Sequence, residues 1–140
     1  MRMEIPRLPV NFMNEDHDHA AEQLETMLAT LPVYAENHAM LAQACRAFLD
    51  HNREHFAREE EAMRVTGFPP YTVHKGEHDR ALAWLDDLTN SIASGGPDSD
   101  TVRQVIEHDI PAWFIQHIQT MDWATANWIS SHPMASSVRV

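Results

Sequence analysis

The sequence predicts an all-α fold, an antiparallel up-down-up-down four-helix bundle with an N-terminal arm. Glycine is scarce, with 4 in 140 residues, and the chain is rich in Ala, Leu, Met and Glu, which favour helices. Apolar residues recur at spacings of three and four along four segments, and no useful stretch alternates with a period of two. Short connections rich in proline or glycine separate the segments, as between antiparallel neighbours in a bundle.

The first predicted helix covers residues 11–31. Pro32 ends it, because the residue before a proline avoids the helical conformation. Asn11 or Asn14 lies at its start, where an amide side chain can cap free backbone N–H groups. We expect the proline-containing arm that precedes this helix to lie over the outside of the bundle.

The second and third predicted helices cover residues 35–65 and 71–94. Gly67, Pro69 and Pro70 lie between them and predict the turn. The apolar stripe of each helix contains histidines at positions where leucine would be expected.

The fourth predicted helix covers residues 101–131, and Pro111 falls inside its pattern. Proline is tolerated in the first turn of a helix but not in its interior, so this helix either kinks at Pro111 or restarts there. Ser99 or Asp100, at the end of the preceding loop, is the predicted cap.

The composition limits the classes of protein and of partner that fit this chain. We expect one domain over residues 1–140. The formal net charge of -11 predicts no nucleic-acid partner and no anionic membrane partner. Cys45 is the single cysteine, so no intrachain disulfide can form. No stretch approaches the roughly 20 apolar residues that span a bilayer. We therefore expect a cytoplasmic protein.

Histidine and carboxylate side chains recur on the core stripes at helical spacings. His55 and Glu59 are four residues apart, and so are His74 and His78. Residues four apart lie on one face of a helix, so each pair can hold one metal ion. A buried imidazole without a partner costs a few kcal/mol. Histidines facing inward from four helices therefore indicate a site for iron, manganese or zinc.

Two assignments are less direct. His117 lies on the stripe of the fourth helix, but Asp122 is five residues later, which at about 100° per residue leaves it roughly 140° out of line. Spacing alone therefore includes His117 and leaves Asp122 open. On the first helix, His17 is in register with apolar residues and His19 with polar ones, so we predict that His17 faces inward.

These residues resemble the hemerythrin family. The family pattern is a histidine on the first helix, His-Phe-x-x-Glu-Glu-x-x-Met on the second, His-x-x-x-His on the third and Trp-x-x-x-His-Ile-x-x-x-Asp on the fourth. The corresponding segments of this chain are Met13-Asn-Glu-Asp-His17, His55-Phe-Ala-Arg-Glu-Glu-Glu-Ala-Met63, His74-Lys-Gly-Glu-His78 and Trp113-Phe-Ile-Gln-His117-Ile-Gln-Thr-Met-Asp122.

The resemblance implies a non-haem di-iron centre with an oxo or hydroxo bridge. Its ligands would be His17, His55, Glu59, His74, His78, His117 and Asp122. The three histidines of the third and fourth helices would hold one iron, the two of the first and second helices would hold the other, and the two carboxylates would bridge them. Asp122, which spacing left open, is thereby included.

The resemblance also implies a function. A chain of this kind would bind dioxygen reversibly for oxygen storage, delivery or buffering, and would not be an enzyme. The alternatives are an oxygen or redox sensor, or a di-iron redox enzyme that acts on peroxide, nitric oxide or ferrous iron.

Aromatic side chains beside the ligands are the candidates for the oxygen pocket, namely Phe56, Trp113 and Phe114. Gln119 stands where the family has an apolar residue. If it points inward, it would hydrogen-bond the bound ligand or admit water.

Two neighbours of the pattern are predicted to take no part in it. Glu60 leaves the ligand face of the second helix, so we expect it to be solvated. His51 lies one turn before His55, and we interpret it as a satisfied core or bundle-end histidine.

Overall fold

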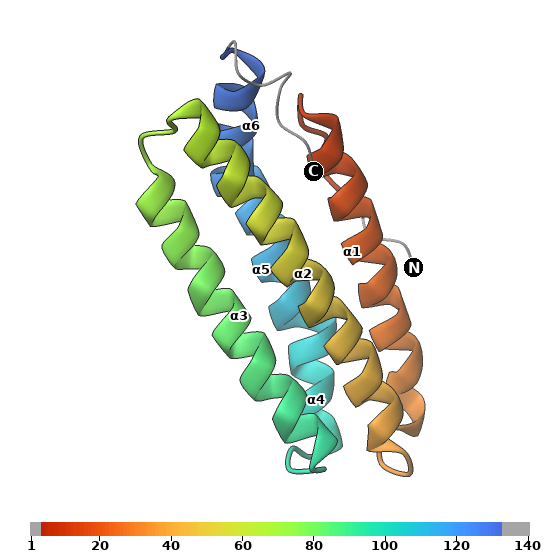
Figure 1. Ribbon diagram of the computed structural model, residues 1–140. Helices are drawn as coiled ribbons and strands as arrows, with labels where there is room; N and C mark the ends of the chain where they lie inside the picture. The colour runs from red at the N-terminus through yellow and green to blue at the C-terminus, as the bar shows by residue number, and fades with distance from the viewer. Residues whose placement is uncertain (1–3, 133–140) are drawn as a thin grey trace.

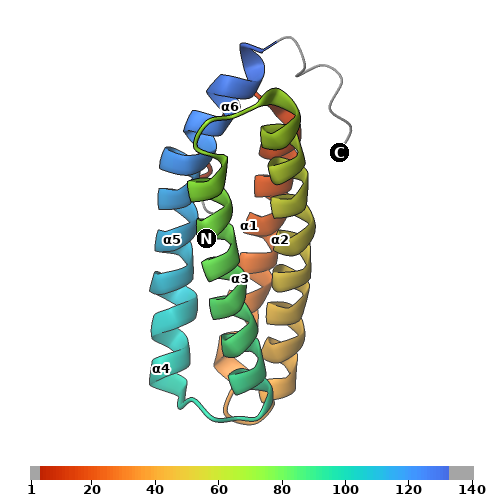
Figure 2. The same cartoon turned by 60° about the vertical axis from the view of Figure 1, so that its left-hand side comes forward.

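The computed structural model describes residues 4–132 of the chain. This part is all-helical, and four helical rods pack as an antiparallel bundle, which confirms the predicted fold class (Figures 1 and 2). The first three rods are α1 (Asn11–Thr30), α2 (His38–Thr66) and α3 (Tyr71–Ala93). The fourth rod is continuous and consists of α4 (Ser99–Gln104), η2 (Val105–Asp109), α5 (Ile110–His117), η3 (Ile118–Asp122) and α6 (Trp123–Ser130).

The N-terminal arm is fixed to α1 by Asn14. Its side-chain oxygen accepts a hydrogen bond from the backbone N–H of Leu8 (2.9 Å), and its amide nitrogen donates to the Leu8 carbonyl (2.8 Å). Val10 is the N-cap residue of α1 and makes no side-chain capping bond. The predicted cap at Asn11 or Asn14 is therefore wrong, because an amide that both donates and accepts can satisfy the two polar groups of one extended residue.

The connection between α1 and α2 takes up more residues than predicted. A 3₁₀ turn, η1 (Leu31–Val33), follows α1, and the backbone N–H of Asn37 then donates to the carbonyl of Val33 (2.8 Å). As a result α2 begins at His38 rather than at residue 35.

The fourth rod passes Pro111 without a break. Pro111 lies in the first turn of α5, directly after the π-helical segment η2. The structure therefore shows the second predicted alternative, a restart with proline in the first turn. At the beginning of this rod, Asp98 caps α4, because its carboxylate accepts a hydrogen bond from the N–H of Thr101 (2.8 Å). The predicted cap at Ser99 or Asp100 is wrong, because the capping residue, Asp98, lies just before them in the loop.

The interior of the bundle differs from one end to the other. The half near η1 and the connection from α3 to α4 is filled by large apolar side chains, such as Leu24, Leu41, Phe48, Ile92 and Ile106, and these are at most 2% exposed. The half near the turn between α2 and α3 contains buried histidines and carboxylates as well. The apolar half thus fixes the rods, and the polar half carries the candidate site. Within the described residues, no helix is long and apolar enough to cross a membrane.

Gly67 ends α2 in the left-handed conformation, with φ of 71°. No atom lies within 4 Å of a Cβ built there, so a substitution meets a backbone penalty and no collision. We predict that Gly67→Ala lowers the free energy of unfolding by about 1 kcal/mol. Gly76→Ala is the matched control inside α3, and it should raise that free energy by about 0.5–1 kcal/mol. Urea denaturation of both variants checks this, and shifts of the same sign would contradict it.

Candidate metal centre

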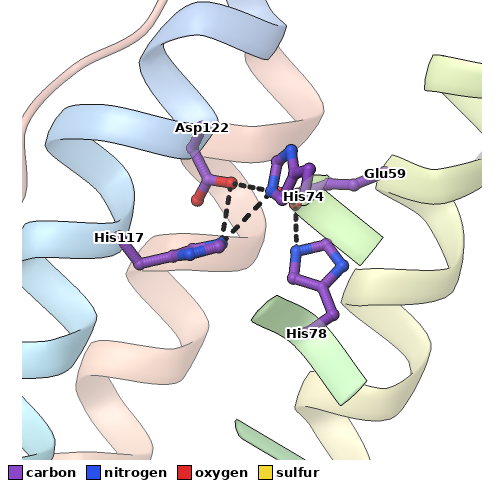
Figure 3. Close-up of side chains that lie close together, drawn as sticks. All are labelled: Glu59, His74, His78, His117 and Asp122. Carbon is purple, nitrogen blue, oxygen red and sulfur yellow. Dashed lines mark hydrogen bonds and ion pairs between the residues drawn. The ribbon is translucent and has the colours of Figure 1, made fainter. Parts of the chain in front are cut away.

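Seven ionisable side chains meet inside the polar half of the bundle. Every one of them is at most 3% exposed. They come from all four rods and are His17, His55, Glu59, His74, His78, His117 and Asp122. Figure 3 shows how Glu59, His74, His78, His117 and Asp122 point toward one another.

The seven side chains form two overlapping sets, and within each set the ligand atoms lie within 4.8 Å of one another. The three-histidine set consists of Glu59, His74, His78, His117 and Asp122. The two-histidine set consists of His17, His55, Glu59 and Asp122. The two carboxylates belong to both sets.

Glu59 directs one oxygen to each set. Its Oε2 lies 2.6 Å from Nε2 of His55, and its Oε1 lies 3.2 Å from Nε2 of His78. A carboxylate whose oxygens face two separate groups of imidazoles is placed to bridge two ions.

Asp122 does the same from the opposite side of the bundle. Its Oδ2 lies 2.8 Å from Nε2 of His17, and its Oδ1 lies 3.1 Å from Nε2 of His117. Figure 3 marks the second of these contacts.

Several of the inward-facing atoms lack a hydrogen-bond partner. Among the described residues, this holds for Nε2 of His55 and His78, both oxygens of Glu59 and Oδ1 of Asp122. Leaving such atoms buried and unsatisfied is costly. Imidazole nitrogens and carboxylate oxygens are ligands for iron, manganese and zinc. The residues therefore fit a pair of metal ions.

Four of the five histidines are held from outside by their Nδ1 atoms. Each Nδ1–H donates to a side-chain oxygen on another helix, while Nε2 faces the centre. The pairs are His55 with Asp16 (2.8 Å), His78 with Glu60 (2.9 Å), His117 with Glu77 (2.6 Å) and His74 with the hydroxyl of Thr125 (2.7 Å). Such bonds fix the tautomer and orientation of metal-binding histidines.

These acceptors were not predicted from the sequence. The prediction that Glu60 is solvated is wrong, because its carboxylate binds His78 on the next helix. A sequence signal does exist: Asp16, Glu60 and Glu77 each lie next to a ligand in the chain. Neighbouring residues point about 100° apart on a helix, so a side chain beside a ligand can reach the ligand of an adjacent helix.

The position of Asp122 depends on a π-helical turn. The segment η3 (Ile118–Asp122) directly follows His117. A π turn contains one more residue than an α turn, and it brings residues five apart onto one face. This explains why α-helical spacing could not decide whether Asp122 belongs to the site.

Gln119 lies in the same turn and is exposed, whereas Ile118 is buried. The prediction that Gln119 lines the oxygen pocket is therefore wrong, because its side chain is exposed to solvent. The other choice made from register agrees with the structure: His17 is buried and His19 is exposed.

Aromatic rings cover the histidines. Phe56 stacks on His78, with ring centroids 3.8 Å apart. Trp113 stacks on His117 at 4.7 Å, and Phe114 meets His17 edge-on at 5.9 Å. Phe56 and Phe114 are buried, and Trp113 is half-buried. The centre is thus shielded from water by large apolar surfaces.

Burial and neighbouring charges shift the pKa values of the candidate ligands. Burial alone lowers the pKa of His55, but attraction to Glu59 and the bond to Asp16 outweigh it and raise that pKa to about 10. Burial likewise opposes the charged form of His117, yet Asp122 and Glu77 raise its pKa to about 10. The pKa of Glu59 is held at about 2, because its attraction to the histidines outweighs burial and repulsion by Asp122.

These shifts predict how the stability of the metal-free protein depends on pH. His55 and His117 have a pKa of about 10 in the folded protein and an ordinary pKa of 6.5. Below pH 6.5 they therefore contribute fully to the stability of the fold, and this contribution is lost as the pH rises toward 10. Glu59 contributes to the stability of the fold above pH 4.5, its ordinary pKa, and this contribution is lost as the pH falls toward 2.

We therefore expect maximal stability of the metal-free protein between about pH 4.5 and 6.5, with a decline toward pH 9. Urea denaturation in the presence of a chelator measures this. A free energy of unfolding that increases steadily from pH 6 to pH 9 would contradict the prediction.

Comparisons with known proteins agree with this geometry. Residues 8–124 match the profile of the Hemerythrin HHE cation binding domain. A bacteriohemerythrin of Ralstonia nicotianae is 33% identical over 115 residues, which cover 82% of this chain and 79% of the relative. A bacteriohemerythrin of Methylococcus capsulatus is 25% identical over 115 residues, with coverage of 81% and 82%.

Crystal structures of hemerythrin show the same fold. One of them, a point mutant, has a TM-score of 0.79 and 22% sequence identity, and the match covers 94% of this chain and 100% of the hemerythrin. The match of the domain profile extends over most of the chain and includes all seven residues of the centre. The chain belongs to the hemerythrin family.

Proposed function

We propose that this protein holds two iron ions and thereby binds dioxygen reversibly, for oxygen storage, delivery or buffering. The observation that carries the proposal is the placement of Glu59 and Asp122, each of which presents one oxygen to either set of histidines. When bound, a pair of ferrous ions supplies two electrons and an open coordination position, which is the chemistry that reversible dioxygen binding requires.

We assign the ligands by the two sets. His74, His78 and His117 would hold one ion, and His17 and His55 would hold the other, with the shared carboxylates between them. The three-histidine set offers five ligating side chains and the two-histidine set offers four. An open position would then lie on the side of His17 and His55, because their set offers one ligand fewer.

The outer hydrogen bonds prepare the histidines for this role. A carboxylate can only accept, so Asp16, Glu60 and Glu77 keep a proton on Nδ1 of their partners. When an ion replaces the proton on Nε2, the lone pair of that nitrogen is already directed to the centre. The site is therefore organised before any ion arrives, and it loses little rotational freedom on binding.

The surroundings of His17 favour binding over redox turnover. The phenyl ring of Phe114 lies edge-on against it, and its Nδ1 has no hydrogen-bond partner among the described residues. The enzyme alternative needs a polar group in the pocket. Gln119 is exposed, and Nε2 of His51 donates to the backbone carbonyl of Asp16 (3.0 Å). An apolar wall slows the entry of water and protons, which supports a carrier.

Anaerobic loading with ferrous iron tests the proposal. We expect two irons per chain, and a visible absorption band that appears in air and disappears when oxygen is removed. His74→Ala should lose the metal pair, because α3 then supplies one imidazole in place of two. His108→Ala is the matched control, since His108 is exposed on the fourth rod and belongs to neither set.

Two results would overturn parts of this proposal. A His74→Ala variant that retains two irons would disprove the ligand assignment. Two irons that pass directly to an oxidised spectrum, with no reversible stage, would replace the carrier with a redox sensor or enzyme.

The aromatic wall gives a further prediction. Phe114→Ala opens the space beside His17, so we expect autoxidation of the oxygenated protein to become about tenfold faster, which corresponds to about 1.4 kcal/mol of barrier. Gln119→Leu is the control, and it should leave the rate unchanged because Gln119 is exposed. Decay of the visible band in air measures both rates. Faster decay in the Gln119 variant alone would locate the pocket on the other side of the rod.

A further inference from the structure

Two histidines outside the buried centre share its ring geometry. His19 on α1 and His51 on α2 have ring centroids 4.6 Å apart and planes at 63°. Within the centre, His74 and His78 are 4.3 Å apart at 60°, and His17 and His55 are 5.0 Å apart at 75°. The centroid distance and interplanar angle of the surface pair are thus close to those of two histidine pairs in the buried centre.

The position and tautomer of His51 are fixed by its neighbours. Its ring is half-buried and lies parallel to that of His55, at 6.2 Å and 3°. Its Nε2 lies 3.0 Å from the backbone carbonyl of Asp16, and because a carbonyl only accepts, this nitrogen carries the proton. Nδ1 is left with a free lone pair.

The other half of the pair faces solvent. His19 is exposed on α1, so water can complete the coordination of an ion held there. Glu15 and Glu22, four residues before and three residues after His19, lie on the same side of α1 and are also exposed. These carboxylates and the net charge of -11 raise the local concentration of cations.

We propose that His19 and His51 form a second, surface site for a borderline divalent cation such as zinc or copper. Two neutral imidazoles with water favour these ions over magnesium and calcium, which prefer oxygen ligands. Neither histidine belongs to either set of the buried centre. The surface site is therefore distinct from the centre proposed to bind dioxygen.

The experiment uses the iron-loaded protein and zinc as the probe. The protein is dialysed against micromolar zinc, and iron and zinc are counted in the same sample. We expect wild type to take up about one zinc per chain with its iron unchanged. His19→Ala should lose that zinc. His51→Phe should lose it as well, while keeping an aromatic ring against His55. His108→Ala, an exposed histidine elsewhere, should retain it.

The outcomes separate clearly. Zinc uptake that persists in both His19→Ala and His51→Phe would overturn the proposal, and so would the absence of uptake by wild type. A loss of iron equal to the zinc gained would show displacement at the buried centre, which also overturns it. The difference in zinc content between wild type and His19→Ala is informative whatever the buried centre holds, so failure here is distinguishable from failure of dioxygen binding.

Discussion

The burial of five imidazoles and two carboxylates at one level of a helical bundle is the constraint on which this structure depends. Seven side chains that are at most 3% exposed would be expensive to desolvate if they faced one another without cations. Two divalent ions would add four positive charges. The two inner carboxylates, the three outer ones and Arg58, which pairs with Asp16, together carry four net negative charges. With neutral imidazoles, the buried centre and its surroundings thus approach neutrality when both ions are bound.

The same interactions that orient the ligands also join the helices. Asp16 on α1 holds His55 on α2, Glu60 on α2 holds His78 on α3, and Glu77 on α3 holds His117 on α5. Each of the first three rods thus supplies the acceptor for a ligand on the next, and Thr125 on the fourth rod holds His74 on α3. A shift of any rod would therefore disturb both packing and coordination, which explains how a site assembled from four separate rods can keep a fixed geometry.

The division of the bundle interior has a functional meaning. The apolar half is filled mostly by large apolar side chains and can hold the rods in place, whereas the polar half buries ionisable groups whose desolvation is costly without ions. Within the polar half, the sets differ by one ligand, and aromatic rings cover the histidines. Unequal coordination together with exclusion of water is the combination that suits a small, reversibly bound ligand. The surface pair His19 and His51 repeats the imidazole geometry without the shielding.

The sequence by itself determined the four helical rods, the inward face of each, and the histidines four residues apart, because a regular α-helix repeats its faces at a fixed angle. The family motif added Asp122. Only the tertiary structure decided that a π turn brings Asp122 to His117 and leaves Gln119 in solvent, since periodicity assumes that every turn is α-helical. It also decided that Glu60 holds His78 and that Asn14 fixes the arm, because contacts between separate segments leave no periodic signal within either one.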